Sequence, residues 1–135
     1  MSKPRSRRIL QVTIGLLATA PFLTGLLGMA GIDNPIYSSR PLPDYVLLDS
    51  NLRYLNGFSV GIALTLYYII PSIEAHTTLL RAICGIIFLG AIGRILSITL
   101  LGLPPFPMPV FVVIEVMAPP ILVFWQNNIR VLVKD

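Results

Sequence analysis

Two charged residues stand within long apolar segments, and their side chains could do chemistry together. Arg94 lies in FLGAIGRILSITL (residues 88–100), and Glu115 lies in VFVVIEVMAPPILVFW (residues 110–125). A charge at the centre of a membrane helix costs about 2.5–3.5 kcal/mol on insertion scales, so such a residue usually faces a partner or a functional cavity. An arginine and a carboxylate can form a bidentate ion pair. These residues therefore predict a structural ion pair, a site for a polar headgroup, or part of a proton path.

The composition indicates that helices in lipid position the two charges. Hydrophobic residues make up 55% of the 135 residues and charged residues only 12%, whereas soluble domains carry about 25% charged residues. Roughly 20 apolar residues in a helix cross the hydrocarbon core of a bilayer. We therefore predict an all-α fold, a bundle of four transmembrane helices over residues 9–30, 50–70, 79–101 and 107–127. They form one transmembrane domain (9–127) between a basic N-terminus (1–8) and a tail (128–135).

Local signals mark the ends of the predicted helices. Asp49 and Ser50 are residue types that cap helix N-termini, and they precede the second apolar segment. Pro71 ends the second helix, because proline disfavours helical backbone in the residue before it. The segment LGLPPFPMP (residues 101–109) contains four prolines. It should form a short stiff turn that makes the third and fourth helices antiparallel neighbours.

Lysine and arginine residues set the expected orientation, because cytoplasmic segments carry an excess of them. One side of the predicted membrane has two, Arg40 and Arg53. The other side, with both chain ends and the loop between the second and third helices, has seven: Lys3, Arg5, Arg7, Arg8, Arg81, Arg130 and Lys134. Both termini are therefore predicted to be cytoplasmic.

Arg94 and Glu115 are expected at matching depth in the membrane. Arg94 is seven residues from Leu101, and Glu115 is eight residues from Pro107. At 1.5 Å per residue these separations are about 10 Å and 12 Å from the outer ends of their helices. Each charge alone would be severely penalised. Glu115 is therefore predicted to hold Arg94 in place.

Other polar side chains extend this pair into a predicted layer. Asn56 lies about 9 Å into the second helix, and Ser97 lies one turn from Arg94 on the outer side. Asp49 and Arg53 are four residues apart, so they can pair near the outer surface. The candidate ligand-binding residues are thus Asn56, Arg94, Ser97, Glu115 and Arg53. A register-fixing ion pair and a helix cap are the alternative, structural interpretations.

Small residues predict close contacts between helices, since they let two backbones approach. Three of the predicted helices carry them at a spacing of three or four residues: Gly25 and Gly28, Gly57 and Gly61, and Gly90, Gly93 and Ser97.

Several classes of chemistry are not expected. No nucleophile with a base and an orienting group, no phosphate loop and no metal cluster is visible, so we predict no enzyme and no cofactor. Cys84 is the only cysteine and His76 the only histidine, which leaves a metal or a haem without a ligand set. The basic N-terminus precedes an apolar segment, and it is expected to set topology rather than to bind nucleic acid.

Three segments resemble a family of small four-helix membrane proteins from bacteria, known only as a domain of unknown function. They are LDSNLRYLNGFSVGIAL, LLRAICGIIFLGAIGRILSITLLGLP and EVMAPPILVFWQ, and the resemblance covers roughly residues 10–127. It implies a four-helix architecture and no reaction. It also implies that Arg53, Arg94, Ser97 and Glu115 are typical positions of the pattern. On this basis we expect a multi-pass protein of a bacterial inner membrane, either cytoplasmic or intracytoplasmic.

Two functions are compatible with these sequence features. The first is a non-catalytic accessory subunit that packs against a larger membrane complex, with membrane lipids and other membrane subunits as partners. Short loops, small size and the lack of a catalytic set favour it. The second is a lipid- or quinone-binding protein, or a small transporter, that uses the layer of Asn56, Arg94 and Glu115.

Overall fold

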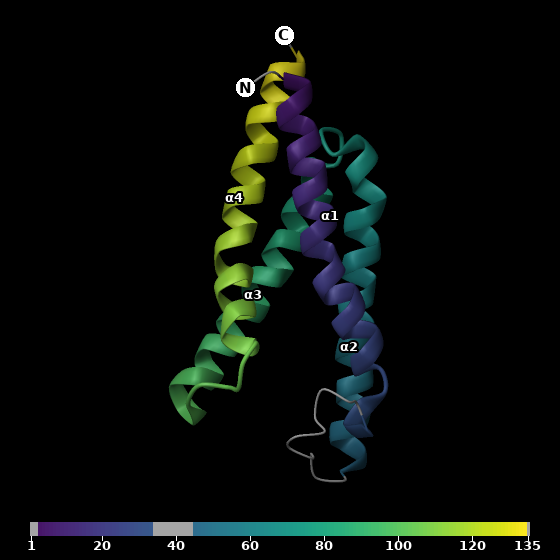
Figure 1. Cartoon of the computed structure of the whole chain (residues 1–135), viewed down its shortest axis with the longest axis vertical. Helices are drawn as coiled ribbons and strands as arrows, with labels where there is room; N and C mark the ends of the chain where they lie inside the picture. The colour runs from purple at the N-terminus through teal and green to yellow at the C-terminus, as the bar shows by residue number, and fades with distance from the viewer. Residues whose placement is uncertain (1–2, 34–44, 135) are drawn as a thin grey trace. The chain divides into compact units, whose positions relative to one another are not determined.

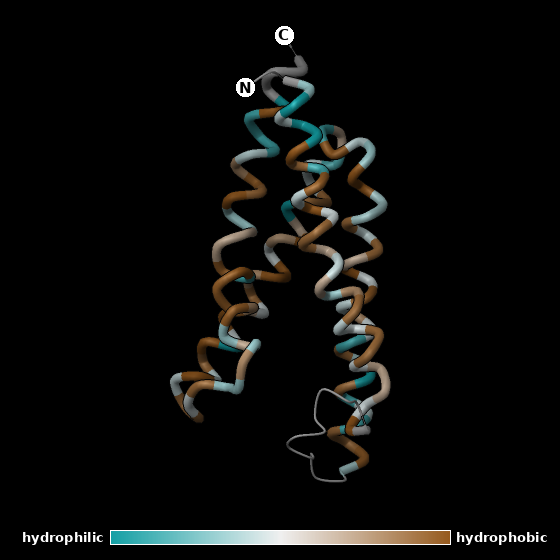
Figure 2. The backbone as a smooth tube through the Cα atoms, in the orientation of Figure 1, coloured by the Kyte–Doolittle hydropathy of each residue, from teal (hydrophilic) through white to brown (hydrophobic). Residues whose placement is uncertain are grey.

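The computed structural model describes residues 3–33 and 45–134, and this part of the chain is all-α, as predicted. It contains four α-helices, α1 (Lys3–Gly28), α2 (Val46–Ile69), α3 (Thr77–Leu101) and α4 (Met108–Lys134), and the short 3-10 turns η1 (Gly31–Asp33) and η3 (Ile70–Ser72) (Figure 1). Each α-helix is long and apolar enough to cross a membrane. Hydrophobic residues occur along each of the four helices (Figure 2).

The chain divides into two compact units. One consists of residues 12–70, with most of α1 and all of α2. The other consists of residues 1–11 and 71–135, with the first residues of α1, the turn after α2, and the helices α3 and α4.

In the first unit, α1 packs closely on α2 through a glycine, as predicted. A Cβ at Gly25 would lie 2.9 Å from both the backbone oxygen of Asn56 and a methyl group of Val60. Farther along, the hydroxyls of Thr19 and Tyr67 lie 3.0 Å apart, and the Tyr67 ring meets Phe22 edge-on. A backbone contact at Gly25 and an aromatic contact about one turn earlier, at Phe22, therefore hold α1 against α2.

The start of α2 differs from the sequence prediction. The helix begins at Val46, and Tyr45 stands at the N-cap without a side-chain cap bond. Asp49, predicted as part of the cap, lies in the first turn, where its carboxylate pairs with Arg53 at 2.7 Å. The same carboxylate accepts the N–H of Ile32 at 3.1 Å, and Arg53 donates to the carbonyl of Met29 at 2.9 Å. Asp49 thus fastens the η1 turn that follows α1 to the start of α2. Apolar residues supply the extra helical turn before Asp49.

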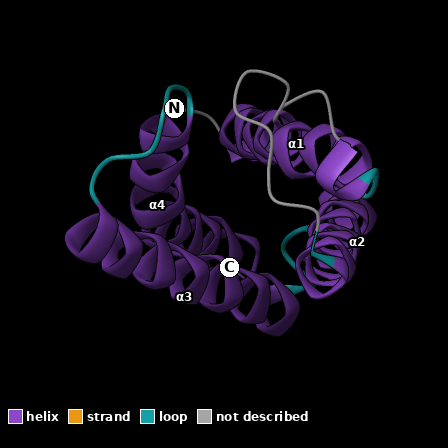
Figure 3. Cartoon of the chain, turned by 90° about the horizontal axis from the view of Figure 1, so that it is seen from below, coloured by secondary structure: helices purple, strands orange, loops and turns teal. Residues whose placement is uncertain are grey.

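In the second unit, α3 and α4 are antiparallel neighbours joined by the short proline-rich turn, as predicted (Figures 1 and 3). Gly102 adopts φ +94°, a value that favours glycine, where α3 ends. Pro109 occupies the second position of α4, where its missing N–H leaves no helical bond unmade.

Both terminal helices are longer than predicted. α1 starts at Lys3 rather than at residue 9, and α4 continues to Lys134 rather than ending at 127. Hydropathy marks only the apolar part of a helix, whereas arginine, lysine and glutamine are themselves good helix formers. Arg40, counted above on the outer side, lies outside the described residues.

Candidate functional site

The structure brings Arg94 of α3 and Glu115 of α4 together. Arg94 Nε lies 3.0 Å from Glu115 Oε2, and the two side chains are 47% and 26% exposed. Arg94 is seven residues from the end of α3, and Glu115 is seven residues from the start of α4. The short antiparallel turn therefore places the two opposite charges at the same level, about 10 Å from the helix ends.

The ion pair leaves much of the guanidinium's hydrogen-bonding capacity unused. An arginine has five N–H donors. Arg94 Nη1 makes one weak contact, 3.9 Å from the sulfur of Met108, and among the described residues Nη2 has no partner. The carboxylate is also under-used, because Glu115 Oε2 is buried and accepts no hydrogen bond with a described residue. The two side chains are therefore held together by charge attraction, and Arg94 keeps N–H donors that have no acceptor among the described residues.

Ser97 lies one turn beyond Arg94 and is exposed. Its hydroxyl makes no hydrogen bond with any described residue, in contrast to Thr99, which bonds back to the carbonyl of Leu96 at 2.8 Å. Arg94, Ser97 and Glu115 thus form a polar group, called here the α3–α4 polar site, on helices that are otherwise apolar at this level.

The other two predicted site residues belong to the first unit. Arg53 pairs with Asp49 and caps the end of α1 through the Met29 carbonyl. Asn56 Nδ2 donates to the Leu52 carbonyl of its own helix at 2.7 Å. Asn56 belongs to one unit and Arg94 and Glu115 to the other, and a continuous layer that joins the three stays a prediction.

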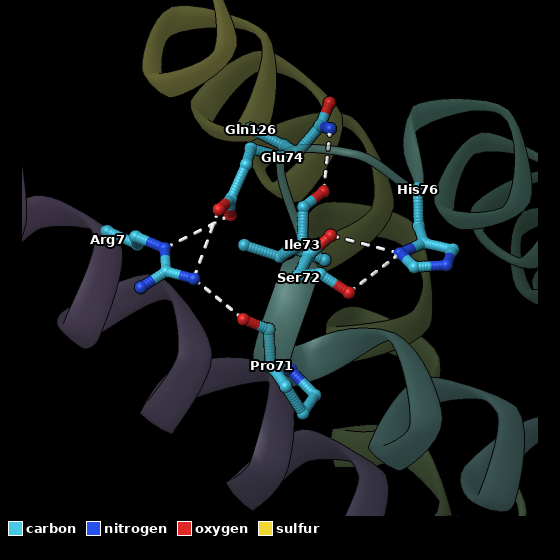
Figure 4. Close-up of polar contacts among 7 residues, drawn as sticks. All are labelled: Arg7, Pro71, Ser72, Ile73, Glu74, His76 and Gln126. Atoms are coloured by element: carbon cyan, nitrogen blue, oxygen red, sulfur yellow. Dashed lines mark hydrogen bonds and ion pairs between the residues drawn. The ribbon is translucent and has the colours of Figure 1, made fainter. Parts of the chain in front are cut away.

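A second polar cluster, at the turn between α2 and α3, was not identified as a site from the sequence (Figure 4). Arg7 of α1 donates from Nε to Glu74 Oε2 at 3.1 Å, and its Nη2 lies 3.1 Å from Oε1. Nη2 also donates to the Pro71 carbonyl at 2.6 Å. Arg7, assigned only to topology above, therefore also fastens the start of α1 to this turn.

The charge state of Glu74 reflects this contact. Its partial burial raises the pKa, but the Arg7 hydrogen bond, a backbone hydrogen bond and electrostatic interactions with Arg7 and His76 lower it more. The pKa of Glu74 therefore lies below its ordinary value, and the carboxylate is ionised at neutral pH.

Gln126 of α4 holds the same turn from the other side. Its side chain is fully buried. Nε2 donates to the Ile73 carbonyl at 3.0 Å (Figure 4) and also to the Thr77 hydroxyl at 2.7 Å. Its neighbour Trp125 donates from Nε1 to the Ser6 hydroxyl at 3.0 Å. The start of α1, the turn and the end of α4 thus meet at one end of this unit.

His76 belongs to the same cluster. Its Nδ1 lies 3.0 Å from the Ser72 carbonyl and 3.2 Å from the Ser72 hydroxyl. No group of three or more potential metal ligands exists among the described residues. The only sequence signal for this cluster was the set of polar residues that follow Pro71. Gln126 could not be linked to it, since Gln126 and Glu74 are 52 positions apart.

Comparison with known proteins assigns the chain to a family without giving it a reaction. The family described as Domain of unknown function (DUF4345) matches residues 9–126, and the chain belongs to this family. No curated protein and no solved structure matches the chain. The resemblance to a family known only as a domain of unknown function is confirmed by this match.

Proposed function

We propose that this protein is a non-catalytic accessory subunit that packs against a larger membrane complex. The observation that carries the proposal is the α3–α4 polar site, where Arg94 is half exposed and keeps unused donors within a membrane-spanning helix. Unsatisfied polar groups in hydrocarbon cost several kcal/mol each. A neighbouring subunit that supplies acceptors would remove this cost.

The small residues of α2 and α3 support the same proposal. A Cβ at Gly57, Gly61, Gly90 or Gly93 would meet no described atom of its own unit within 4 Å. The expected close contacts at these glycines are therefore not made within either unit, unlike the contact at Gly25. Small residues are enriched where membrane helices associate, so these faces suit helices of other proteins.

The proposed orientation places both termini in the cytoplasm of a bacterial inner membrane. Its support is the meeting of the start of α1, the turn after α2 and the end of α4 in one unit. The positive residues with described side chains in these segments are Arg5, Arg7, Arg8, Arg81 and Arg130. An excess of such residues marks the cytoplasmic side. Membrane lipids and other membrane subunits are the proposed partners, and nucleic acid is not.

Native mass spectrometry after mild extraction from the source membrane tests the proposal. The 14.8 kDa chain should arrive in a stoichiometric assembly with at least one different membrane protein. The same extraction in a harsher detergent should release the folded chain and serves as the control. A chain that arrives alone, or only with copies of itself, in the mild detergent would show that the proposal is wrong.

Lipid or quinone binding, or transport, is the second candidate, and the exposure of Arg94 favours it as well. A headgroup could take the unused N–H donors. The neighbouring Glu115 carboxylate weighs against an anionic headgroup, because it would repel the phosphate. A lipid-sized adduct that persists on the isolated chain and disappears in Arg94→Ala, with the fold retained, would favour this candidate.

A further inference from the structure

We infer that the α3–α4 polar site docks a transmembrane helix of a different subunit through an asparagine or glutamine side chain of that helix. The inference rests on the proposed function and names the chemistry of the partner. Arg94 Nη2 offers N–H donors and the exposed Ser97 hydroxyl offers an oxygen acceptor, and neither has a hydrogen-bond partner among the described residues. A carboxamide has one carbonyl acceptor and two N–H donors, so a single such group can serve both sets.

The charges of the site favour this neutral group over an anion. Arg94 and Glu115 are 3.0 Å apart and cancel each other. A carboxylate or a lipid phosphate that approached Arg94 would also approach Glu115 and be repelled. A carboxamide adds no net charge. Its carbonyl oxygen can face the Arg94 guanidinium while its NH2 group lies on the side of the Glu115 carboxylate.

A second copy of this chain fits the site poorly. Copies inserted in one orientation and related by a two-fold axis along the membrane normal would bring identical faces of α3 together. Arg94 of one copy would then face Arg94 of the other at the same depth. Each Arg94 is already paired with Glu115, so the mismatch is one of hydrogen bonding: two guanidinium groups offer each other only N–H donors and no acceptor. A different partner is therefore favoured.

The helix surface beside the site has room for such a partner. At 3.6 residues per turn, Gly90, Gly93 and Ser97 share one face of α3, and Arg94 stands at its edge. Both glycines are exposed and open within their unit. A partner backbone can therefore come close enough for a short side chain such as asparagine to reach the guanidinium.

Site-specific photo-crosslinking in native membranes tests the inference. The probe p-benzoylphenylalanine replaces Ile86, which lies on the same face one turn from Gly90, or Ile92, which faces away from it. The two isoleucines are 55% and 49% exposed and form a matched pair. We expect position 86 to give an adduct with a different protein, mapped to a membrane segment that contains asparagine or glutamine, and position 92 to give none above background.

The site itself is tested by variants that carry the probe at position 86. Replacing the pair together (Arg94→Met with Glu115→Met) leaves no unpaired charge and should lower the adduct yield about tenfold, the scale of one or two interhelical hydrogen bonds. Ser97→Ala should lower it by a smaller factor, while Thr99→Ala, on the opposite face, should leave it unchanged. Thermal unfolding of each purified variant establishes that it is folded. If the double variant does not fold, the adduct yield of Ser97→Ala still tests the site.

The outcomes separate the inference from the proposed function. Position 86 could form an adduct with another protein in a yield that neither the double variant nor Ser97→Ala changes. That result would overturn the docking site and leave the accessory role unaffected. The same holds if native mass spectrometry shows a mixed complex but position 86 gives no protein adduct. An adduct only with this chain, or only with lipid, together with no mixed complex, would overturn both.

Discussion

Arg7 and Glu74, 67 positions apart in the chain, form an ion pair with Nη2 and Oε1 3.1 Å apart. This contact joins the first turns of α1 to the turn between α2 and α3. Glu74 lies in this turn, between the candidate membrane spans of α2 and α3, where pH and salt can act on its carboxylate directly.

The first prediction concerns the pH dependence of this pair. Because the pKa of Glu74 is lowered in the folded protein, the stabilisation it gives is present above the unfolded value of about 4.3 and is lost as pH falls through the folded pKa. Glu74→Gln should lower the free energy of unfolding by about 0.5 kcal/mol at pH 7, as for a partly exposed ion pair. The difference from wild type should vanish below the folded pKa, as measured by unfolding of the solubilised chain at both pH values. Arg7→Gln, which removes the other partner of the ion pair, is the matched control. An equal effect of Glu74→Gln at both pH values would contradict a lowered Glu74 pKa in the folded protein.

The second prediction concerns the buried amide of Gln126. Gln126→Leu keeps the volume but leaves the Ile73 carbonyl and the Thr77 hydroxyl without their donor. A buried group that loses its partner costs about 1–3 kcal/mol, so the midpoint of unfolding should fall clearly. The neighbour Asn128, which is less buried, provides the control, and Asn128→Leu should stay within about 0.5 kcal/mol of wild type. Equal effects of the two changes would show that the Gln126 hydrogen bonds contribute nothing.

The third prediction concerns the ion pair between α3 and α4. Arg94→Leu alone leaves the Glu115 carboxylate without its counter-charge, and it should destabilise the isolated chain by about 1–3 kcal/mol, less than the loss of a fully buried pair. Adding Glu115→Leu should restore part of this loss, because no charge then remains. Unfolding of the two single variants and the double variant gives the coupling energy. Additive effects would mean that the two charges do not stabilise each other.

The fourth prediction compares Gly25, which is in close contact with a neighbouring helix, with Gly57, which has open space beside it. Gly25→Ala should destabilise the chain by about 1–3 kcal/mol, because its Cβ would meet the Asn56 backbone at 2.9 Å. Gly57→Ala on α2 should be neutral or stabilise the isolated chain by up to about 1 kcal/mol, since the space is open and alanine is the better helix former. Thermal unfolding in one detergent compares them. A loss of stability in Gly57→Ala as large as in Gly25→Ala would show that this face is already covered within the chain.

The amino-acid sequence by itself determined the features that depend on hydropathy and spacing. Long apolar segments must be helices in lipid, since only a helix satisfies the backbone of a single segment there. The four-proline turn makes α3 and α4 antiparallel, and similar residue counts from that turn bring Arg94 and Glu115 to one level. The i, i+4 spacing of Asp49 and Arg53 likewise predicts their pair.

The tertiary structure decided what no local pattern contains. Gln126 binds the turn at Ile73, and Arg7 binds Glu74, through contacts between positions more than 50 residues apart. It also decided that Gly25 meets a backbone while Gly57 and Gly90 do not within their own units, although all three look alike in the sequence. Hydropathy and spacing fix which face of a helix a residue occupies, but only packing determines which neighbour that face meets.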